Sequence, residues 1–165
     1  MRTHDGFFLR TGLGGASLSL KPPVGETLSG SGGAFDLAIG GTLGSGFVLA
    51  GDLAFNSFKK TVFNTDITYT LVSLSLLGDW YFDPKGGLHA QLGLGSAGVD
   101  AAARGTSGSV GNGGIVTLGV GYDAFVSDEW SLGGLLRFQR VTLKKDDVET
   151  ATVTNVGVFF VATYH

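Results

Sequence analysis

The sequence has no cysteine, few charged residues and no long apolar run. Without cysteine, the 165-residue chain can form neither a disulfide framework nor a thiolate metal site. Charged residues make up 15% of the chain, against about 25% in typical soluble domains. The longest apolar run, Val156 to Ala162, falls far short of the roughly 20 residues of a membrane-spanning helix. These absences exclude a helical membrane protein and make an ordinary soluble domain a poor fit.

The charge balance and the start of the chain narrow the classes further. A net charge of -3 without a basic field argues against a nucleic-acid partner. Abundant Leu, Val and Phe argue against disorder. The segment Met1 to Arg10 lacks the apolar stretch of a signal peptide. If the protein is exported, we expect residues 1–165 to be its mature part, folded as one domain.

The sequence is rich instead in glycine and in alternating apolar residues. Glycine occurs 29 times, well above the usual frequency of about 7%. Large apolar residues alternate with small or polar ones in eight segments separated by turn residues, which predicts eight β-strands. We expect the strands at residues 6–17, 34–43, 47–57, 70–82, 88–98, 115–126, 130–140 and 153–164.

Charge is confined to one face of these strands. The apolar face carries no charged residue before Arg140. The opposite face carries glycine, alanine and the charged residues Arg10, Asp36, Asp52, Asp79, Asp123 and Arg137. An eight-stranded barrel has an interior only just wide enough for side chains, so the small face belongs inside and the apolar face outside, in lipid. This predicts an all-β, eight-stranded antiparallel up-and-down transmembrane β-barrel; a soluble lipocalin-like binder is the alternative, because alternation alone allows either face inside.

The connections between the predicted strands alternate in length. Tight turns at 44–46, 83–87 and 127–129 alternate with longer segments at 21–33, 58–69, 99–114 and 141–152. Short periplasmic turns and long extracellular loops are typical of barrels in the bacterial outer membrane. We therefore expect both termini on the periplasmic side and the long loops outside the cell.

Aromatic residues fall where these barrels carry interfacial girdles. We expect the periplasmic, lipid-facing girdle to contain Phe7, Phe47, Trp80, Phe82, Trp130 and Tyr164. Near the opposite rim we expect Phe55, Tyr69 and Phe138. We also expect a bulge at Gly14–Gly15, because Leu18 and Leu20 change to the other parity beyond it.

The two end strands carry a family resemblance. The segments GFFLRTGLG, from Gly6 to Gly14, and NVGVFFVATY, from Asn155 to Tyr164, resemble the first and last strands of the small outer-membrane barrels of the OmpA/OmpX-like superfamily. In that family the last strand carries an assembly signal, and Asn155, Gly157, Phe160 and Ala162 match its pattern. Such chains usually end on an aromatic residue, and we assign Tyr164 to this place in the signal, although it is followed here by His165.

The resemblance implies an integral outer-membrane protein with a structural or surface-interaction role. It implies contact with outer-membrane lipid and lipopolysaccharide, and with the barrel-assembly machinery during biogenesis. We also expect a monomer. Lys59–Lys60 and Lys144–Lys145 could meet lipopolysaccharide phosphates, and Asp146, Asp147 and Glu149 could hold a cation, although solvated loop charge explains both groups equally simply.

The predicted lumen holds two arginines and four aspartates, and each charge needs a partner in a low dielectric. We expect Arg10 and Arg137 to sit among the carboxylates as a hydrogen-bonded plug. The supporting polar residues are Asn56, Tyr81, His89, Gln91, Gln139 and Asn155. The surplus of acid implies a protonated aspartate, a bound cation or ordered water. The alternative is a narrow channel for ions or apolar solutes, because the inward Gly and Ala residues leave room.

Catalysis is the third possibility, since some small barrels modify lipid A with Ser-His-acid chemistry. The only histidines are His4, His89 and His165, and we expect the two terminal ones to be disordered. His89 would face Tyr81 in the lumen, within reach of Asp79 or a serine. A hydrogen-bonded lumenal histidine is the favoured interpretation. We therefore predict no enzyme activity, no cofactor and no metal site.

Overall fold

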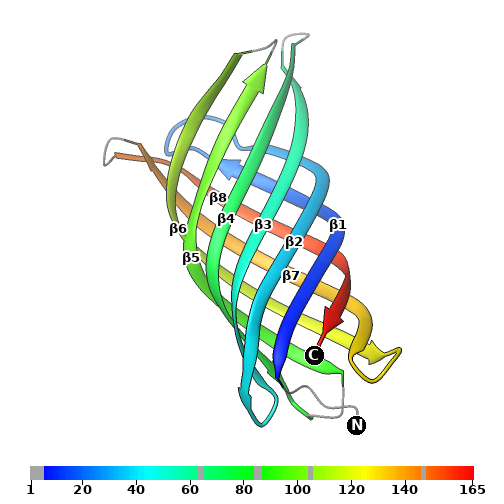
Figure 1. The fold of residues 1–165 in the computed structure, drawn as a ribbon. Helices are drawn as coiled ribbons and strands as arrows, with labels where there is room; N and C mark the ends of the chain where they lie inside the picture. The colour runs from blue at the N-terminus through cyan, green and yellow to red at the C-terminus, as the bar shows by residue number, and fades with distance from the viewer. Residues whose placement is uncertain (1–5, 63–64, 84–86, 104–105, 146–147) are drawn as a thin grey trace.

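The wall of the molecule consists of eight β-strands in this computed structural model, which describes residues 6–62, 65–83, 87–103, 106–145 and 148–165. The strands are β1 (Phe7–Lys21), β2 (Leu28–Gly44), β3 (Phe47–Val62), β4 (Thr65–Tyr81), β5 (Leu88–Ala103), β6 (Thr106–Phe125), β7 (Trp130–Lys145) and β8 (Val148–Tyr164). Each pairs antiparallel with the next, and β8 pairs with β1, so the sheet closes into a barrel (Figure 1). The predicted all-β fold is confirmed. Within the described residues, no helix is long and apolar enough to cross a membrane.

The strand register sets the width of the barrel. Followed from Leu9 on β1 across each neighbouring strand in turn, the register returns to β1 at Ser19, ten residues further along. An eight-stranded barrel with this kind of stagger has strands tilted by roughly 35–45° and an interior that side chains can fill. The inward-facing side chains therefore meet across the lumen as a packed core.

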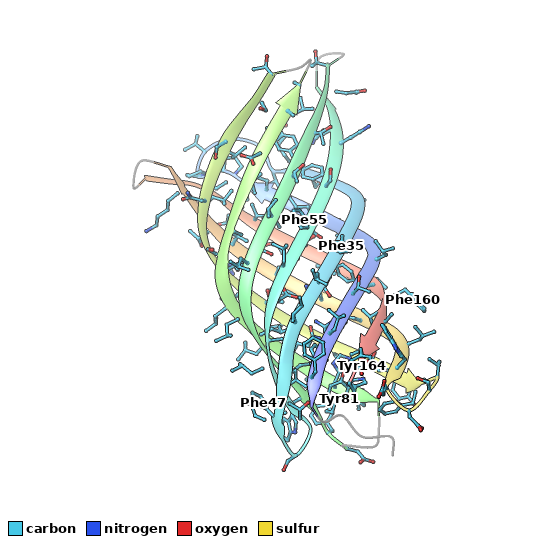
Figure 2. The ribbon with its side chains drawn as sticks, in the orientation of Figure 1. Phe35, Phe47, Phe55, Tyr81, Phe160 and Tyr164 are labelled. Carbon is cyan, nitrogen blue, oxygen red and sulfur yellow. The ribbon has the colours of Figure 1, made fainter. Side chains whose placement is uncertain are left out.

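An apolar band surrounds the outside of the barrel on the side of the chain termini. On β7, Trp130, Leu132, Leu136 and Phe138 face outward, and each is more than a third exposed. The stretch from Trp130 to Phe138 has the length of about 9–11 residues that a tilted strand needs to cross a bilayer. Figure 2 shows Phe160 of β8 projecting likewise from the outside of the wall. The band has the dimensions and the chemistry of a lipid-facing surface.

The polarity of the wall reverses beyond this band. On β1 the outward residues change from Leu13 to Ser17, Ser19 and Lys21, while Leu18 and Leu20 are buried inside the barrel. A wall that leaves lipid and enters water is stable only if its apolar side chains move to the interior, as in a soluble barrel. The far end of the molecule therefore has a water-compatible exterior.

The strands are longer at this far end than the sequence predicted. Among the strands that rise from the terminal side, β1 continues to Lys21 and β3 to Val62. Among the returning strands, β4 already begins at Thr65 and β6 at Thr106. The predicted long loops are therefore wrong in conformation: most of their residues extend the barrel wall, and 22–27 is the longest irregular segment described at this end. The prediction ended each strand where the outward apolar residues stopped, which is the edge of the band and not the end of the strand.

Two smaller predictions are also wrong. The register of β1 runs without interruption through Gly14 and Gly15 to both neighbouring strands, so the expected bulge is not there. Tyr69 was expected in the outer girdle, but it is only 9% exposed and stacks on Phe58 inside the barrel, with ring centroids 5.0 Å apart. On β1 a reversal of polarity between the two faces explains the pattern without a bulge. On β4 the parity of Tyr69, which it shares with Asp79 and Tyr81, directs its side chain inward.

Candidate functional site

Arg10 lies at the centre of a charged layer in the lumen, on the terminal side. Its Nη1 donates a hydrogen bond to Oδ2 of Asp79 at 2.8 Å, and its Nε donates to Oδ1 of Asp36 at 3.3 Å. The three side chains come from β1, β4 and β2, and each is fully buried. One guanidinium thus joins three strands and neutralises part of the charge on two carboxylates.

Arg137 on β7 occupies the other side of the same layer. Its Nη1 lies 2.7 Å from Oδ2 of Asp36, and its Nη2 lies 3.2 Å from Oδ1 of Asp52. Asp36 therefore lies between the two arginines. The guanidinium carbon of Arg137 is 5.5 Å from the ring centroid of Phe159, which supports the cation on its apolar side.

His89 connects the arginine layer to the end of the barrel where the termini lie. Its Nδ1 is 2.7 Å from Oδ1 of Asp79, and its Nε2 is 3.9 Å from Oδ1 of Asp123. The imidazole stacks on the Tyr81 ring at a centroid distance of 4.8 Å. The Tyr81 hydroxyl in turn donates to Asp123 at 2.9 Å. His89 therefore has a structural position between two carboxylates, buried under an aromatic ring.

Two further side chains donate hydrogen bonds to the aspartates of this layer, one from a predicted lumen residue and one from a residue that was not predicted. Gln91 donates to Asp79 at 2.7 Å. Thr163, which was not among the predicted lumen residues, donates to Asp123 at 3.2 Å. The inward parity of Thr163 on the last strand was the signal that could have identified it.

His165 closes the lumen on the terminal side. Its backbone N–H donates to the carbonyl of Glu129 at 2.9 Å, and its Nε2 is 2.9 Å from the Ser131 hydroxyl. Its ring packs near those of Phe8 and Phe125, at centroid distances of 6.0 and 5.3 Å. The expectation that His165 is disordered is wrong, because the inward parity of β8 directs this side chain into the aromatic mouth. His4 lies outside the described residues.

An uncharged polar layer lies on the other side of the arginines. Asn155 donates to Gln139 at 2.9 Å, and Gln139 donates to Thr117 at 3.3 Å. Asn56 of β3 and Ser73 of β4 are also buried at this level. Every predicted lumen residue is therefore inside the barrel and at most 4% exposed, namely Arg10, Asp36, Asp52, Asp79, Tyr81, His89, Gln91, Asp123, Arg137, Gln139 and Asn155.

An apolar cluster, which was not predicted, fills the lumen beyond the polar layers. Its buried members are Leu18, Leu20, Phe58, Tyr69, Leu71, Ala97, Val99, Ile115, Val141, Leu143, Ala151 and Val153. All eight strands except β2 contribute to this list, and Leu28 of β2 packs against it. Large apolar residues at inward parity, such as Leu71 and Leu143, were the signal that could have revealed it. The lumen thus has a charged end and an apolar end.

Neighbouring side chains fill the space beside several inward glycines. A Cβ on Gly121 would collide with the imidazole of His89, and one on Gly133 would collide with Asp123. A Cβ on Gly119 would lie 3.0 Å from Oε1 of Gln91. The room that the glycines leave is therefore used by the polar network.

The predicted girdle residues lie on the outside of the terminal end. Phe7, Phe47, Trp80, Phe82 and Trp130 are each between 41% and 54% exposed. Tyr164 contacts both Phe7 and Trp130, with ring centroids 6.2 and 5.4 Å apart. Of the predicted assembly residues on β8, Asn155 and Gly157 are buried, Phe160 is exposed, and Ala162 and Tyr164 are half-buried.

The described part of the chain contains no group of three or more His, Asp or Glu side chains arranged to hold a metal ion. Of the acidic group considered from the sequence, Asp146 and Asp147 lie outside the described residues, and the side chain of Glu149 is not described either.

No family model matches the chain, and no curated protein matches it. Several solved structures do. Neisserial surface protein A is 16% identical, with 96% of each chain covered and a TM-score of 0.67. The fold is that of the small outer-membrane barrels. Ail, the attachment invasion locus protein of Yersinia pestis, solved with the heparin analogue sucrose octasulfate, is 14% identical over 96% of this chain and 99% of its own, with a TM-score of 0.61. The outer membrane protein OprG from Pseudomonas aeruginosa is 12% identical over 99% and 96%, with a TM-score of 0.54.

The comparisons support the architecture over nearly the full length of each outer-membrane barrel. The expected resemblance to eight-stranded outer-membrane barrels is therefore confirmed for the fold. Since identities of 12–16% leave side chains unmatched, the lumen of this outer-membrane barrel fold has to be interpreted from its own residues.

Proposed function

We propose that the protein is an integral barrel of the bacterial outer membrane, with a structural or surface-interaction role and a lumen closed by its own side chains. The observation that carries the proposal is the double closure of the lumen. Arg10, Arg137 and their aspartates fill the half within the apolar band, and the apolar cluster fills the half beyond it. Ions would have to cross the apolar cluster, and apolar solutes would have to cross the charged layer.

The proposed orientation places the termini in the periplasm and the polar extension of the barrel outside the cell. In outer-membrane barrels the longer segments are extracellular, and here every strand continues beyond the band on the side away from the termini. The names of two structural neighbours, a surface protein and an attachment protein, agree with a role at the cell surface. The wall beyond the band would present that surface.

A catalytic role has weaker support than a structural one. His89 is fully buried and already holds Asp79 at 2.7 Å. Catalytic groups that act on lipid must reach the membrane surface, and this imidazole is shielded by Tyr81. We therefore propose that the protein is not an enzyme.

Conductance in a planar bilayer tests the closed lumen. We expect the folded protein, reconstituted from detergent, to produce no discrete current steps, because both closures must open together for ions to pass. A large porin in the same lipid serves as the positive control. Reproducible steps that persist in repeatedly purified protein would contradict the closure and favour the small channel for ions or apolar solutes.

Arginine substitutions on the outer wall test the position of the membrane. Val120 lies midway along the apolar stretch of β6, whereas Thr142 is outward-facing beyond the band on β7. We expect Val120→Arg to lower the free energy of unfolding in vesicles by about 2–4 kcal/mol, and Thr142→Arg by about 0–1 kcal/mol, because the cost of a cation falls towards the interface. Urea titration followed by tryptophan fluorescence measures both. Equal costs would place the band outside the bilayer and favour the soluble binder.

A further inference from the structure

A basic pocket lies on the outer wall where the apolar band ends. It has a cavity volume of about 470 Å³ and is lined by residues of β1, β7, β8 and the segment after β1. Two of its lining residues are cations, Lys21 and Arg140, and four carry hydroxyl groups, Ser19, Thr27, Thr152 and Thr154. This combination of two cations and several hydroxyl donors suits an oxyanion.

The strand register explains why these side chains meet. Arg140 of β7 pairs with Thr154 of β8, which pairs on its other side with Ser19 of β1. Lys21 pairs with Thr152, two residues further along the same strands. The two cations thus flank one strand and are separated by about 10 Å of sheet, a gap that two long, flexible side chains can close around one phosphate group. Pro22 and Pro23 form part of the lining and stiffen its edge.

Within the described residues, neither cation is engaged by an acidic side chain. The ion pairs of Arg10, Arg137 and His89 all lie in the lumen, away from this pocket. Glu26 is the neighbour of Thr27 in the chain, but it does not line the pocket. Lys21 and Arg140 are both exposed, so their charge is available to a ligand that approaches from the outside.

The position of the pocket along the barrel, next to the apolar band, indicates the source of the oxyanion. The outward residues next to the lining, on the side of the apolar band, are Phe138, two residues before Arg140 on β7, and Val156, two residues after Thr154 on β8. The pocket therefore spans the first polar rows above the apolar band, which is the level of lipid headgroups. A phosphate at this level belongs to a lipid whose acyl chains lie against the apolar band below it.

We infer that this pocket binds a phosphate group of a glycolipid in the outer leaflet. The inference rests on the proposed outer-membrane location and orientation, and it assigns Lys21 and Arg140 as the cations that hold the phosphate. The hydroxyl groups of Ser19, Thr152 and Thr154 supply neutral donors around it. The site fixes a lipid on the β7–β8–β1 side of the wall.

Binding of phosphorylated lipid A by the folded, detergent-solubilised protein tests the site, with native mass spectrometry as the readout. We expect the double variant Lys21→Gln, Arg140→Gln to bind bisphosphorylated lipid A about tenfold more weakly than the natural sequence. The matched control is Lys59→Gln, Lys60→Gln, which removes the same charge from β3 at the same end of the barrel but outside the pocket. We interpret this lysine pair as solvated charge and not as a phosphate contact, so we expect less than a twofold change. Equal losses in the two double variants would overturn the pocket in favour of general charge attraction.

Two further probes separate the lipid from its parts. We expect the unsubstituted protein and the Lys21→Gln, Arg140→Gln variant to bind dephosphorylated lipid A equally weakly. We also expect that inorganic phosphate, at the concentration of the lipid, does not displace phosphorylated lipid A. The inference would be overturned if the unsubstituted protein bound dephosphorylated lipid A as tightly as phosphorylated lipid A, or bound free phosphate as tightly as lipid A. Insertion into vesicles is measured on the same samples. Insertion without phosphate-dependent binding refutes the pocket alone, whereas failure to insert refutes the proposed function.

Discussion

Replacing Arg137 by methionine is expected to lower the free energy of unfolding by about 3–5 kcal/mol. Arg137 is 1% exposed and lies 2.7 Å from Asp36 and 3.2 Å from Asp52. Removing one partner of a buried ion pair leaves a charge that neither water nor protein compensates. Asp36 keeps the Nε of Arg10 at 3.3 Å, so most of the cost falls on Asp52. Urea unfolding in phospholipid vesicles, followed by tryptophan fluorescence, measures the loss.

Two matched variants separate charge from packing in this experiment. Arg140→Gln alters an exposed cation on the outer face of the same strand, and we expect a change within about 0.5 kcal/mol. Adding Asp52→Asn to Arg137→Met removes the uncompensated carboxylate and should restore a substantial part of the stability, giving a non-additive cycle. If Arg137→Met costs no more than Arg140→Gln, or if Asp52→Asn restores nothing, the lumenal ion pairs do not hold the barrel together.

The inward position of the lumen residues could be predicted from the sequence, because a strand has a period of two. Once the small, charged face was placed inside, the parity of Arg10 also placed Phe8 and Gly12 inside, and no other information was needed. The argument is strong in a narrow barrel because residue size and polarity select the same face. A one-residue error in strand parity would have placed Asp36 and Asp52 in lipid.

The pairing of these residues could not be predicted, because it depends on the stagger of the whole barrel. Arg10 and Asp79 bond across 69 positions in the chain, and Arg137 and Asp52 across 85. Two strands that are not neighbours meet only through the tilt that closure imposes on all eight. Local patterns show that each charge is inside, but the height at which it sits is a property of the closed sheet.

The apolar half of the lumen was missed because the apolar face was assumed to be the same along each strand. A barrel that extends beyond a membrane is surrounded by lipid along one part of its wall and by water along the other. The apolar face of each strand is therefore the outer face in lipid and the inner face in water. Leu18 and Leu20 follow this rule on β1, and Val141 and Leu143 follow it on β7. In the sequence, this exchange of the apolar face is itself a marker of the proposed membrane edge, and it falls next to Arg140 on β7 and at Ser17 on β1.

Replacing Gly14 by alanine is expected to destabilise the barrel by about 3 kcal/mol or more, whereas the same change at Gly15 is expected to be nearly neutral. Gly14 lies where β1 meets β8 and closes the barrel, paired with Phe159. A Cβ at Gly14 would overlap the carbonyl group of Val158, which is backbone and cannot rotate away. Overpacking commonly costs about 1–3 kcal/mol when side chains can adjust, and here the whole seam would have to separate.

Gly15 is the control because it lies between the same two strands, β2 and β8, whereas a Cβ at Gly15 would point to the opposite face of the wall. A Cβ on Gly15 would find its nearest atom, the carbonyl oxygen of Gly32, at 3.7 Å, which is ordinary contact. Alanine also loses less backbone entropy than glycine on folding, so Gly15→Ala can be slightly stabilising. Urea titration in vesicles and heat-modifiable mobility on gels report both variants. If the two alanine variants are equally stable, β1 does not approach β8 closely at Gly14, and the high glycine content needs an explanation other than the tight coiling of strands in a narrow barrel.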